Sequence, residues 1–286
     1  MPVPIESISL LRPAAAASGL LLLWLLEARI GTPRRQPEVS WFRHAARNLS
    51  LAGINATLMP VTAAAITAAT IEWASSNQLG LLNWCILSPA IELLTGVLLM
   101  DVWTWFWHRT CHQLPFLWRF HRVHHSDPDM DVTTAFRFHP GELLLSAFAR
   151  LPVICLLGLA AWHLLVYETL LLAASQFHHA ALPAGRWDEF LRRWIVTPAI
   201  HRIHHARELP FTNSNYSSLL SCWDKLFGTW QNPLETAPNS TTHTGPKPPS
   251  CGLDGMDSET WQTLPGMTLT PCLGVQKSTS IQPPAP

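Results

Sequence analysis

The sequence has little charge, few tyrosines and none of the common cysteine or nucleotide-binding motifs. Charged residues make up 13% of its 286 residues, about half of the share in a typical soluble domain. Lysine plus arginine and aspartate plus glutamate balance at 19 each, which argues against a nucleic-acid-binding surface. The six cysteines form no CxxC pair, so neither a disulfide framework nor a cysteine-ligated zinc site is expected. So small a share of charged residues indicates a protein that is embedded in a membrane.

Long apolar runs are present instead, and they predict membrane helices. Residues 48–71 and 79–107 are each long enough to span a bilayer. Residues 143–177 are mostly Leu and Ala and suffice for two helices that turn near Gly158. A shorter charge-free run at 13–26 predicts an anchor helix. We therefore predict an all-α, integral membrane bundle of about four to five membrane helices.

Arginines predict how this bundle is oriented. Residues 27–47 carry five arginines, so this loop is expected in the cytosol. The helices at 48–71 and 79–107 then bring the chain back to the cytosolic side, and the hairpin at 143–177 does so again. A helical, histidine-rich cap is therefore expected on the cytosolic side of the endoplasmic reticulum membrane or the bacterial inner membrane.

Histidine is in excess, with 14 residues that fall mainly in blocks. His108 and His112 are spaced by one helical turn and share a face. The blocks HRVHH at 121–125 and HRIHH at 201–205 repeat one spacing, and the pair at 178–179 adds another ligand. Imidazole binds Zn, Cu, Fe or Ni, and one zinc site uses three or four protein ligands, so nine imidazoles predict two ions. The predicted ligands are His108, His112, His121, His124, His125, His201, His204, His205 and one of His178 and His179.

Two acidic residues precede the first histidine pair on the same predicted helix. Asp101 lies two turns before His108 and close to the same face, so we expect its carboxylate behind the metal ligands. Glu92 lies roughly opposite that face and is expected to pair inside the bundle. Three isolated histidines are expected to take no part in metal binding: His44, His163 and His243.

Residues 95–230 resemble the fatty acid hydroxylase/sterol desaturase superfamily of membrane di-iron enzymes. The resemblance rests on Asp101 with HRTCH, then LWRFHRVHHS, TAFRFHPGE, FHHAALP, TPAIHRIHH and NYSSLLSCWDKLFGTW. It implies two iron ions, O2 as co-substrate, and electrons from a separate b-type cytochrome, ferredoxin or reductase. It also implies that the histidines above are the iron ligands and that Asp224 tethers the histidine blocks without binding metal.

The resemblance divides the chain into three parts and implies a function. N-terminal membrane helices are expected at 1–94, the di-iron catalytic domain at 95–230, and a disordered Pro/Ser/Thr-rich tail at 231–286. The implied activity is oxygen-dependent hydroxylation or desaturation of a membrane lipid, such as a fatty acyl, alkyl or sterol-like chain. Two alternatives stay open: a carotenoid hydroxylase or ketolase, which uses similar histidine blocks, and a metal-transporting or metal-storing membrane protein.

Overall fold

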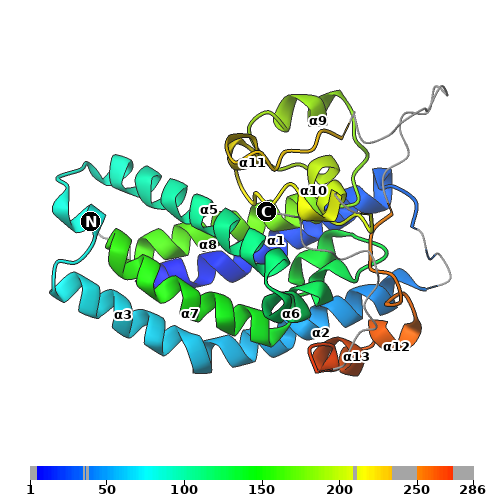
Figure 1. Ribbon diagram of the computed structural model, residues 1–286, viewed down its shortest axis with the longest axis horizontal. Coiled ribbons are helices and arrows are strands. Elements are labelled where there is room, and N and C mark those ends of the chain that lie inside the picture. The colour runs from blue at the N-terminus through cyan, green and yellow to red at the C-terminus, as the bar shows by residue number, and fades with distance from the viewer. Residues whose placement is uncertain (1–4, 35, 37–38, 209–210, 234–249, 273–286) are drawn as a thin grey trace.

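The regular structure of the described chain is helical and contains no strand. The computed structural model describes residues 5–34, 36, 39–208, 211–233 and 250–272. The long helices run side by side and form a bundle (Figure 1). They are α1 (Ile5–Ile30), α2 (Trp41–Met59), α3 (Ala65–Ser76), α5 (Pro89–Gln113), α7 (Pro140–Leu157) and α8 (Ala161–His179).

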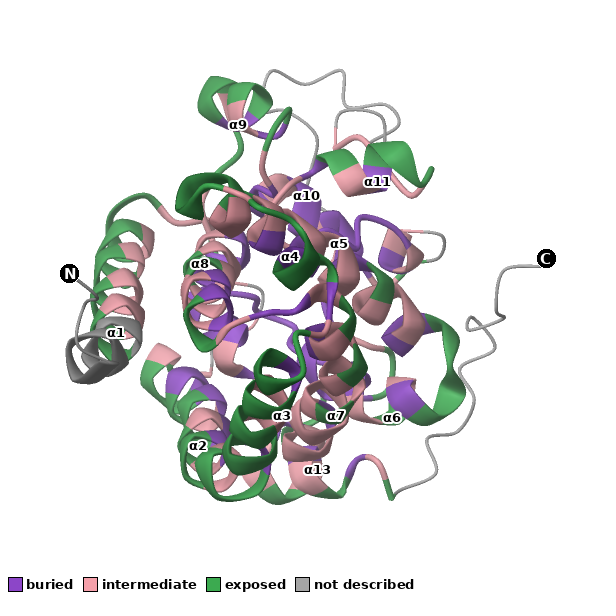
Figure 2. Cartoon of the chain, turned by 90° about the vertical axis from the view of Figure 1, so that its left-hand side faces the viewer, coloured by how far each residue is buried: buried purple, intermediate pink, exposed green. Residues whose placement is uncertain are grey.

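Four segments are long and apolar enough to cross a membrane. Viewed along the bundle, α1 lies at its edge beside α8, and exposed residues cover most of α3 (Figure 2). Large apolar side chains are among the exposed residues, including Val61 and Leu156, as expected where helices contact lipid. The prediction of a helical membrane bundle is therefore confirmed. The four segments are Pro13–Ile30, Trp41–Trp84, Pro89–Gln113 and Pro140–Leu157.

Prolines alter two of the predicted helices. The rod formed by α2 and α3 contains a π-helical turn, Pro60–Ala64, because a proline inside a helix lacks the N–H that closes the regular ladder. The apolar run at 79–107 is not one helix as predicted. It contains the short α4 (Leu81–Trp84), and α5 begins only at Pro89, since proline is favoured in the first helical turn.

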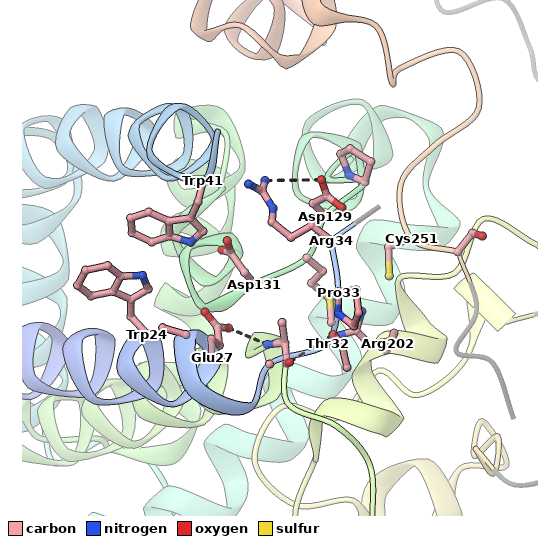
Figure 3. A pocket seen from close by; sticks show the side chains of 16 residues that line it. Trp24, Glu27, Thr32, Pro33, Arg34, Trp41, Asp129, Asp131, Arg202 and Cys251 are labelled. Carbon is pink, nitrogen blue, oxygen red and sulfur yellow. Dashed lines mark hydrogen bonds and ion pairs between the residues drawn. The ribbon is translucent and has the colours of Figure 1, made fainter. Parts of the chain in front are cut away.

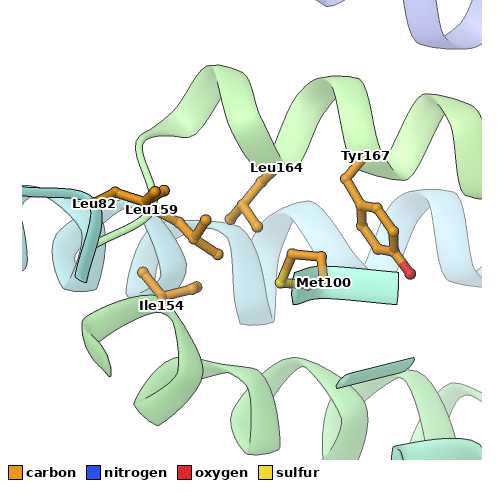
Figure 4. Close-up of a cluster of buried hydrophobic side chains, with 6 residues drawn as sticks. All are labelled: Leu82, Met100, Ile154, Leu159, Leu164 and Tyr167. Carbon is orange, nitrogen blue, oxygen red and sulfur yellow. The ribbon is translucent and has the colours of Figure 1, made fainter. Parts of the chain in front are cut away.

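The turn between α7 and α8 falls at Gly158, as predicted. This glycine has φ 71° and ψ 39°. That left-handed backbone conformation is unfavourable for residues that have a Cβ atom. Beside it, Gly80 approaches so closely that a Cβ atom there would lie 2.1 Å from the Gly158 nitrogen. This end of the bundle is filled by an apolar cluster (Figure 4) that comprises Leu82, Met100, Ile154, Leu159, Leu164 and Tyr167.

Short helices and loops form a cap at the other end of the bundle. Figure 1 shows α9, α10 and α11 gathered over that end, with α6, α12 and α13 nearby. The cap elements are α6 (Pro115–His125), η2 (Val132–Phe136), α9 (Arg186–Leu191), α10 (Pro198–His204), η3 (Phe211–Asn213), α11 (Cys222–Leu226), α12 (Glu259–Gln262) and α13 (Leu264–Leu269).

Arg137 joins the cap to the bundle. It is fully buried, and its Nη1 donates to Asn48 Oδ1 of α2 over 2.9 Å. Its Nε donates to the Val123 carbonyl of α6 over 2.9 Å, and its Nη2 donates to Ser126 Oγ and to Gln262 Oε1, both over 2.8 Å. One guanidinium therefore connects α2, α6 and α12.

The prediction of a disordered tail over 231–286 is wrong for residues 250–272. Met267 of α13 is buried against Leu51 and Val123. Gln262 donates through Nε2 to the Ser126 carbonyl over 2.8 Å. The segment is ordered because it fills an apolar gap and pairs buried polar groups, neither of which its local sequence pattern reveals. Residues 234–249, which include His243, and residues 273–286 lie outside the described chain.

Candidate metal centre

Nine of the ten candidate histidines gather in two groups where the bundle meets the cap. In each group the candidate ligand atoms lie within 4.8 Å of one another. All nine are buried except His108, which is half-buried. The five-histidine group comprises His108, His112, His121, His125 and His204, and the four-histidine group comprises His124, His179, His201 and His205.

The two HxxHH blocks divide between the groups in opposite ways. The first block lies in α6, and the second lies in α10 with His205 as its C-cap residue. His121 and His125 of the first block belong to the five-histidine group, and His124 belongs to the other. In the second block, His201 and His205 belong to the four-histidine group, and His204 to the five-histidine group. Residues four apart share a helix face, and the intervening one is rotated away, so the helical spacing itself separates two centres.

The pair at the end of α8 contributes one histidine to these groups. His179 belongs to the four-histidine group, whereas His178 belongs to neither. The ring of His178 lies 4.0 Å from the ring of His201, centroid to centroid. Of the two histidines between which the sequence left the choice open, His179 is the one that lies in a candidate group.

Unprotonated ring nitrogens face each other in the five-histidine group. The Nδ1–H of His108 donates to the Tyr216 carbonyl over 2.8 Å, and Nδ1 of His121 lies 2.7 Å from Glu142 Oε1. A neutral imidazole has only one N–H, so Nε2 of both rings carries a lone pair. These two nitrogens are 3.1 Å apart, an unfavourable arrangement unless a cation lies between them.

In the four-histidine group, Nε2 of His179 likewise carries a lone pair. The Nδ1–H of His179 donates to the Ser175 carbonyl over 2.7 Å. Its Nε2 lies 3.1 Å from Nε2 of His124 and 3.0 Å from Nε2 of His201. Two nitrogens bound to one ion at about 2.1 Å and at a right angle are about 3.0 Å apart. The spacing therefore fits one metal ion.

Two further imidazoles have a buried nitrogen with no hydrogen-bond partner. Nδ1 of His204 pairs with the Ser214 carbonyl over 2.7 Å, and Nδ1 of His112 lies 3.3 Å from Asn213 Oδ1. The Nε2 atoms of both rings are buried and unpaired. Leaving such an atom unsatisfied costs about 1–3 kcal/mol, which a bound cation would offset.

The buried imidazoles of the cap are held in the form that binds metal. Burial, followed by the neighbouring imidazoles, lowers the pKa of His124 and His125 well below the usual value. The same causes lower the pKa of His201 and His205. These rings are therefore neutral at pH 7, as metal ligation requires.

The carboxylate of Asp101 does not lie behind the histidines as predicted. Its carboxylate is fully buried and accepts from the Leu219 and Leu220 amides over 3.2 and 3.1 Å. It also accepts from Trp223 Nε1 over 2.6 Å. Asp101 therefore holds the loop before α11, because that loop, rather than a histidine, packs on this face of α5.

Asp224 acts on the five-histidine group through the same loop. Its Oδ1 accepts from the Tyr216 amide over 2.8 Å and from Trp105 Nε1 over 2.9 Å. The carbonyl of Tyr216 in turn accepts from His108. This geometry agrees with a tethering role for Asp224.

Sequence reasoning missed Glu142. This residue lies in the first turn of α7, and its Oε1 is 2.7 Å from Nδ1 of His121. Its Oε2 is buried and has no partner, and Cys111, His121 and Glu142 together form a third possible ligand set. The only signal in the sequence was an acid directly after His139-Pro140-Gly141 at the start of an apolar helix.

The two isolated histidines that the structure describes, His44 and His163, pair with carboxylates. His163 lies 3.3 Å from Glu92 inside the bundle, so the predicted internal pairing of Glu92 is confirmed. His44 is buried, and its two ring nitrogens lie 2.9 Å from Asp127 and 3.1 Å from Asp131. Neither histidine belongs to a candidate metal group.

A cavity of about 460 Å³ reaches both histidine groups. It lies among α2, α5, α7 and α8, and much of its wall is apolar. His108 and His121 of the five-histidine group line it, together with His124, His179 and His201 of the other group. Its apolar wall includes Trp103, Trp107, Leu143, Leu171 and Leu172.

A second cavity, of about 680 Å³, lies beside α1. Trp24 and Trp41 stack there with ring centroids 4.8 Å apart, and Glu27 accepts from the Ala181 amide over 2.7 Å (Figure 3). None of the ten candidate histidines lines it. The contact of Glu27 with Ala181 links α1 to the chain that follows α8. This cavity is therefore not part of the candidate metal centre.

Comparisons with known proteins agree with this geometry. Residues 93–229 match the fatty acid hydroxylase family model. Ornithine lipid hydroxylase OlsE of Rhizobium tropici is 31% identical over 156 residues, which cover 53% of this chain and 45% of that protein. Human alkylglycerol monooxygenase is 26% identical over 49% of this chain and 34% of its own.

A third relative, rat cholesterol 25-hydroxylase, is 27% identical over 52% of this chain and 48% of its own. The matches therefore span less than half of the length of each of these relatives. No solved structure matches the chain. The family match and these relatives together show that residues 93–229 belong to the fatty acid hydroxylase superfamily.

Proposed function

We propose that the chain is an oxygen-dependent hydroxylase of a membrane lipid, with one iron ion in each histidine group. The observation that carries this proposal is one cavity in the membrane bundle that is lined by histidines of both groups. The names of the relatives add support, since all three describe hydroxylases or monooxygenases, two of them of a lipid or a sterol.

The donor set favours iron once the reaction is considered. Imidazole binds several first-row metals, and the two groups supply five and four imidazoles. When bound, iron supplies the redox chemistry that activates oxygen for attack on a C–H bond, which redox-inactive zinc does not. The reaction consumes a C–H bond, O2, two electrons and two protons, and it releases an alcohol and water. The electrons come from a separate donor protein.

The protein's own residues position the reactants. The apolar wall holds the lipid chain and excludes water from the reacting carbon. The carbonyls of Tyr216, Ser214 and Ser175 fix the tautomers of His108, His204 and His179, which aims their Nε2 atoms at the centres. The arginines of residues 27–47 favour a cytosolic cap.

Substitution of one histidine in each group tests this function. We expect His124→Ala combined with His204→Ala to lose bound iron and oxygen-dependent lipid oxidation, because each group lacks a ligand. His163→Gln is the matched control, since His163 is buried but belongs to neither group. Metal analysis of the purified protein and lipid profiling of expressing membranes provide the readouts.

Three results would contradict the proposal. Full lipid oxidation by the double variant would show that the groups are not the reactive centre. Metal flux into proteoliposomes without lipid turnover would instead favour a transporter. Oxidised pigments in place of oxidised lipids would favour the carotenoid enzymes.

A further inference from the structure

An ion pair between two helices of the bundle lies in the wall of the cavity. Arg150 of α7 pairs through Nη1 with Glu168 Oε1 of α8, and both residues line the cavity. Their side chains are 19% and 24% exposed, so neither is sealed in the protein interior. Arg150 lies near the middle of a segment that can cross a membrane. Charged groups are costly at that depth and are typically retained for function.

The pair marks the end of the cavity that is remote from the histidines. Among the residues of α7 that line the cavity, Glu142 lies nearest the histidines and Arg150 lies farthest from them. Among the residues of α8 that line the cavity, His179 lies at the end with the histidine groups and Glu168 lies farthest from them. At 1.5 Å per residue, the helical rise between these ends is about 12 Å along α7 and about 16 Å along α8. The cavity therefore has a metal-binding end and a charged end.

The charged end suits a group that both donates and accepts hydrogen bonds. The guanidinium of Arg150 carries five N–H groups, and its pair with Glu168 engages Nη1, which leaves further N–H groups that can donate to an oxygen. The carboxylate of Glu168 can accept from an O–H or N–H group. The neighbouring lining residues Leu171, Leu172 and Trp103 are mainly apolar. A hydroxyl or an amide can accept from Arg150 and donate to Glu168, whereas a hydrocarbon can do neither.

A second pair in the same bundle shows that an ion pair alone does not make such a site. Glu92 of α5 and His163 of α8 lie 3.3 Å apart, but neither lines the cavity. That pair has a packing role, and it provides the control for the pair at the cavity.

We propose that Arg150 and Glu168 bind a polar group of the lipid substrate and thereby determine which carbon reaches the histidine groups. This inference rests on the proposed hydroxylase function. The substrate class is a lipid that carries a hydroxyl or amide about 12–16 Å from the carbon that is oxidised. Arg150 and Glu168 are specificity-determining residues and do not take part in the oxidation itself.

The position of the product hydroxyl tests the inference. Membranes that contain the full, iron-loaded chain are supplied with oxygen, a reduced electron donor and saturated long-chain 1-alcohols of increasing length, or with alkanes of the same lengths. We expect the wild type to oxidise a carbon at a fixed distance from the existing hydroxyl. We also expect it to prefer alcohol to alkane by about tenfold or more, the effect of one hydrogen bond to a charged group.

The test variant is Arg150→Leu combined with Glu168→Leu. Replacing both members with apolar residues avoids an unpaired charge and is commonly neutral for stability. We expect this variant to keep its iron but to oxidise several carbons and to lose the preference for the alcohol. Glu92→Leu should retain both properties. If the leucine variant fails to load iron, Arg150→Met combined with Glu168→Met, which keeps long side chains but removes both charged groups, takes its place.

The outcomes separate this inference from the proposed function. An unchanged product position and preference in the iron-loaded double variant would overturn the inference alone. Oxidation of the cell's own lipids, but of no alcohol, would also overturn it. If the iron-loaded wild type oxidises no lipid at all, the proposed function fails, and the inference fails with it.

Discussion

At the residue scale, four imidazoles of the candidate centre are held by the ring nitrogen that faces away from it. His108, His179 and His204 each present Nδ1 to a main-chain carbonyl, and His121 presents it to Glu142. These contacts select the tautomer whose Nε2 carries the lone pair. These imidazole rings are therefore preorganised for a cation and need not rotate when it binds.

The two adjacent histidines of α8 should differ sharply when each is replaced. We expect His179→Ala to lose about half of the bound iron, since it removes one of the four imidazoles of its group. His178→Ala should retain both ions, because His178 belongs to neither group. Iron per chain, measured on purified protein, compares the two variants. Equal losses would show that both residues, or neither, bind metal.

Glu142 is expected to support metal binding through His121. Glu142→Leu leaves Nδ1 of His121 without its acceptor, and loss of such an outer partner lowers metal affinity by about 10–100-fold. Glu142→Gln keeps an acceptor and should have a smaller effect. Competition with a chelator measures the affinity, and Glu259→Gln, at an exposed pair with Arg47, is the control. Wild-type affinity in Glu142→Leu would refute this role.

At the scale of the elements, the turn between α7 and α8 depends on close backbone packing. A Cβ atom on Gly158 would lie 2.7 Å from the Leu79 carbonyl oxygen, and its left-handed conformation adds about 1–2 kcal/mol for any other residue. The α7–α8 connection therefore requires glycine. Since α7 and α8 also carry Glu142 and His179, the turn helps to place both sides of the cavity.

Alanine substitutions at two glycines should shift stability in opposite directions. We expect Gly158→Ala to lower the free energy of unfolding by about 1–2 kcal/mol or more. Gly53→Ala should raise it by about 0.5–1 kcal/mol, because Gly53 lies within α2 and a Cβ atom there has nothing within 4 Å. Thermal unfolding in detergent measures both. Similar shifts in the two variants would contradict the tight turn.

At the scale of the whole molecule, the C-terminal segment closes the cap over the bundle. Residues 250–272 reach Arg137 through Gln262 and reach α2 and α6 through Met267. The cap therefore depends on three parts of the chain that are far apart in sequence.

Two neighbouring residues of α13 distinguish a packed segment from a loose tail. We expect Met267→Ala to destabilise the protein by about 2–5 kcal/mol, because it empties a buried site. Leu269→Ala should have little effect, since Leu269 is 52% exposed. Unfolding in detergent compares them, and a wild-type result for Met267→Ala would restore the view that residues 250–272 do not pack on the cap.

The sequence by itself determined the features that depend on short-range spacing. The apolar runs predicted the bundle because only helices of that length satisfy their backbone groups in lipid. The HxxHH spacing indicated two centres because residues three and four apart diverge on a helix by a known angle. The turn near Gly158 was predictable because the apolar run at 143–177 is long enough for two helices, and a glycine lies near its middle.

Only the tertiary structure decided the features that depend on contacts between distant segments. It distinguished His179 from His178, paired Glu142 with His121, and directed Asp101 to the loop before α11 rather than to a histidine. It also ordered residues 250–272, whose buried Met267 has its apolar partners on α2 and α6. Local periodicity contains no information about such partners, because they are brought together only when the whole chain is packed.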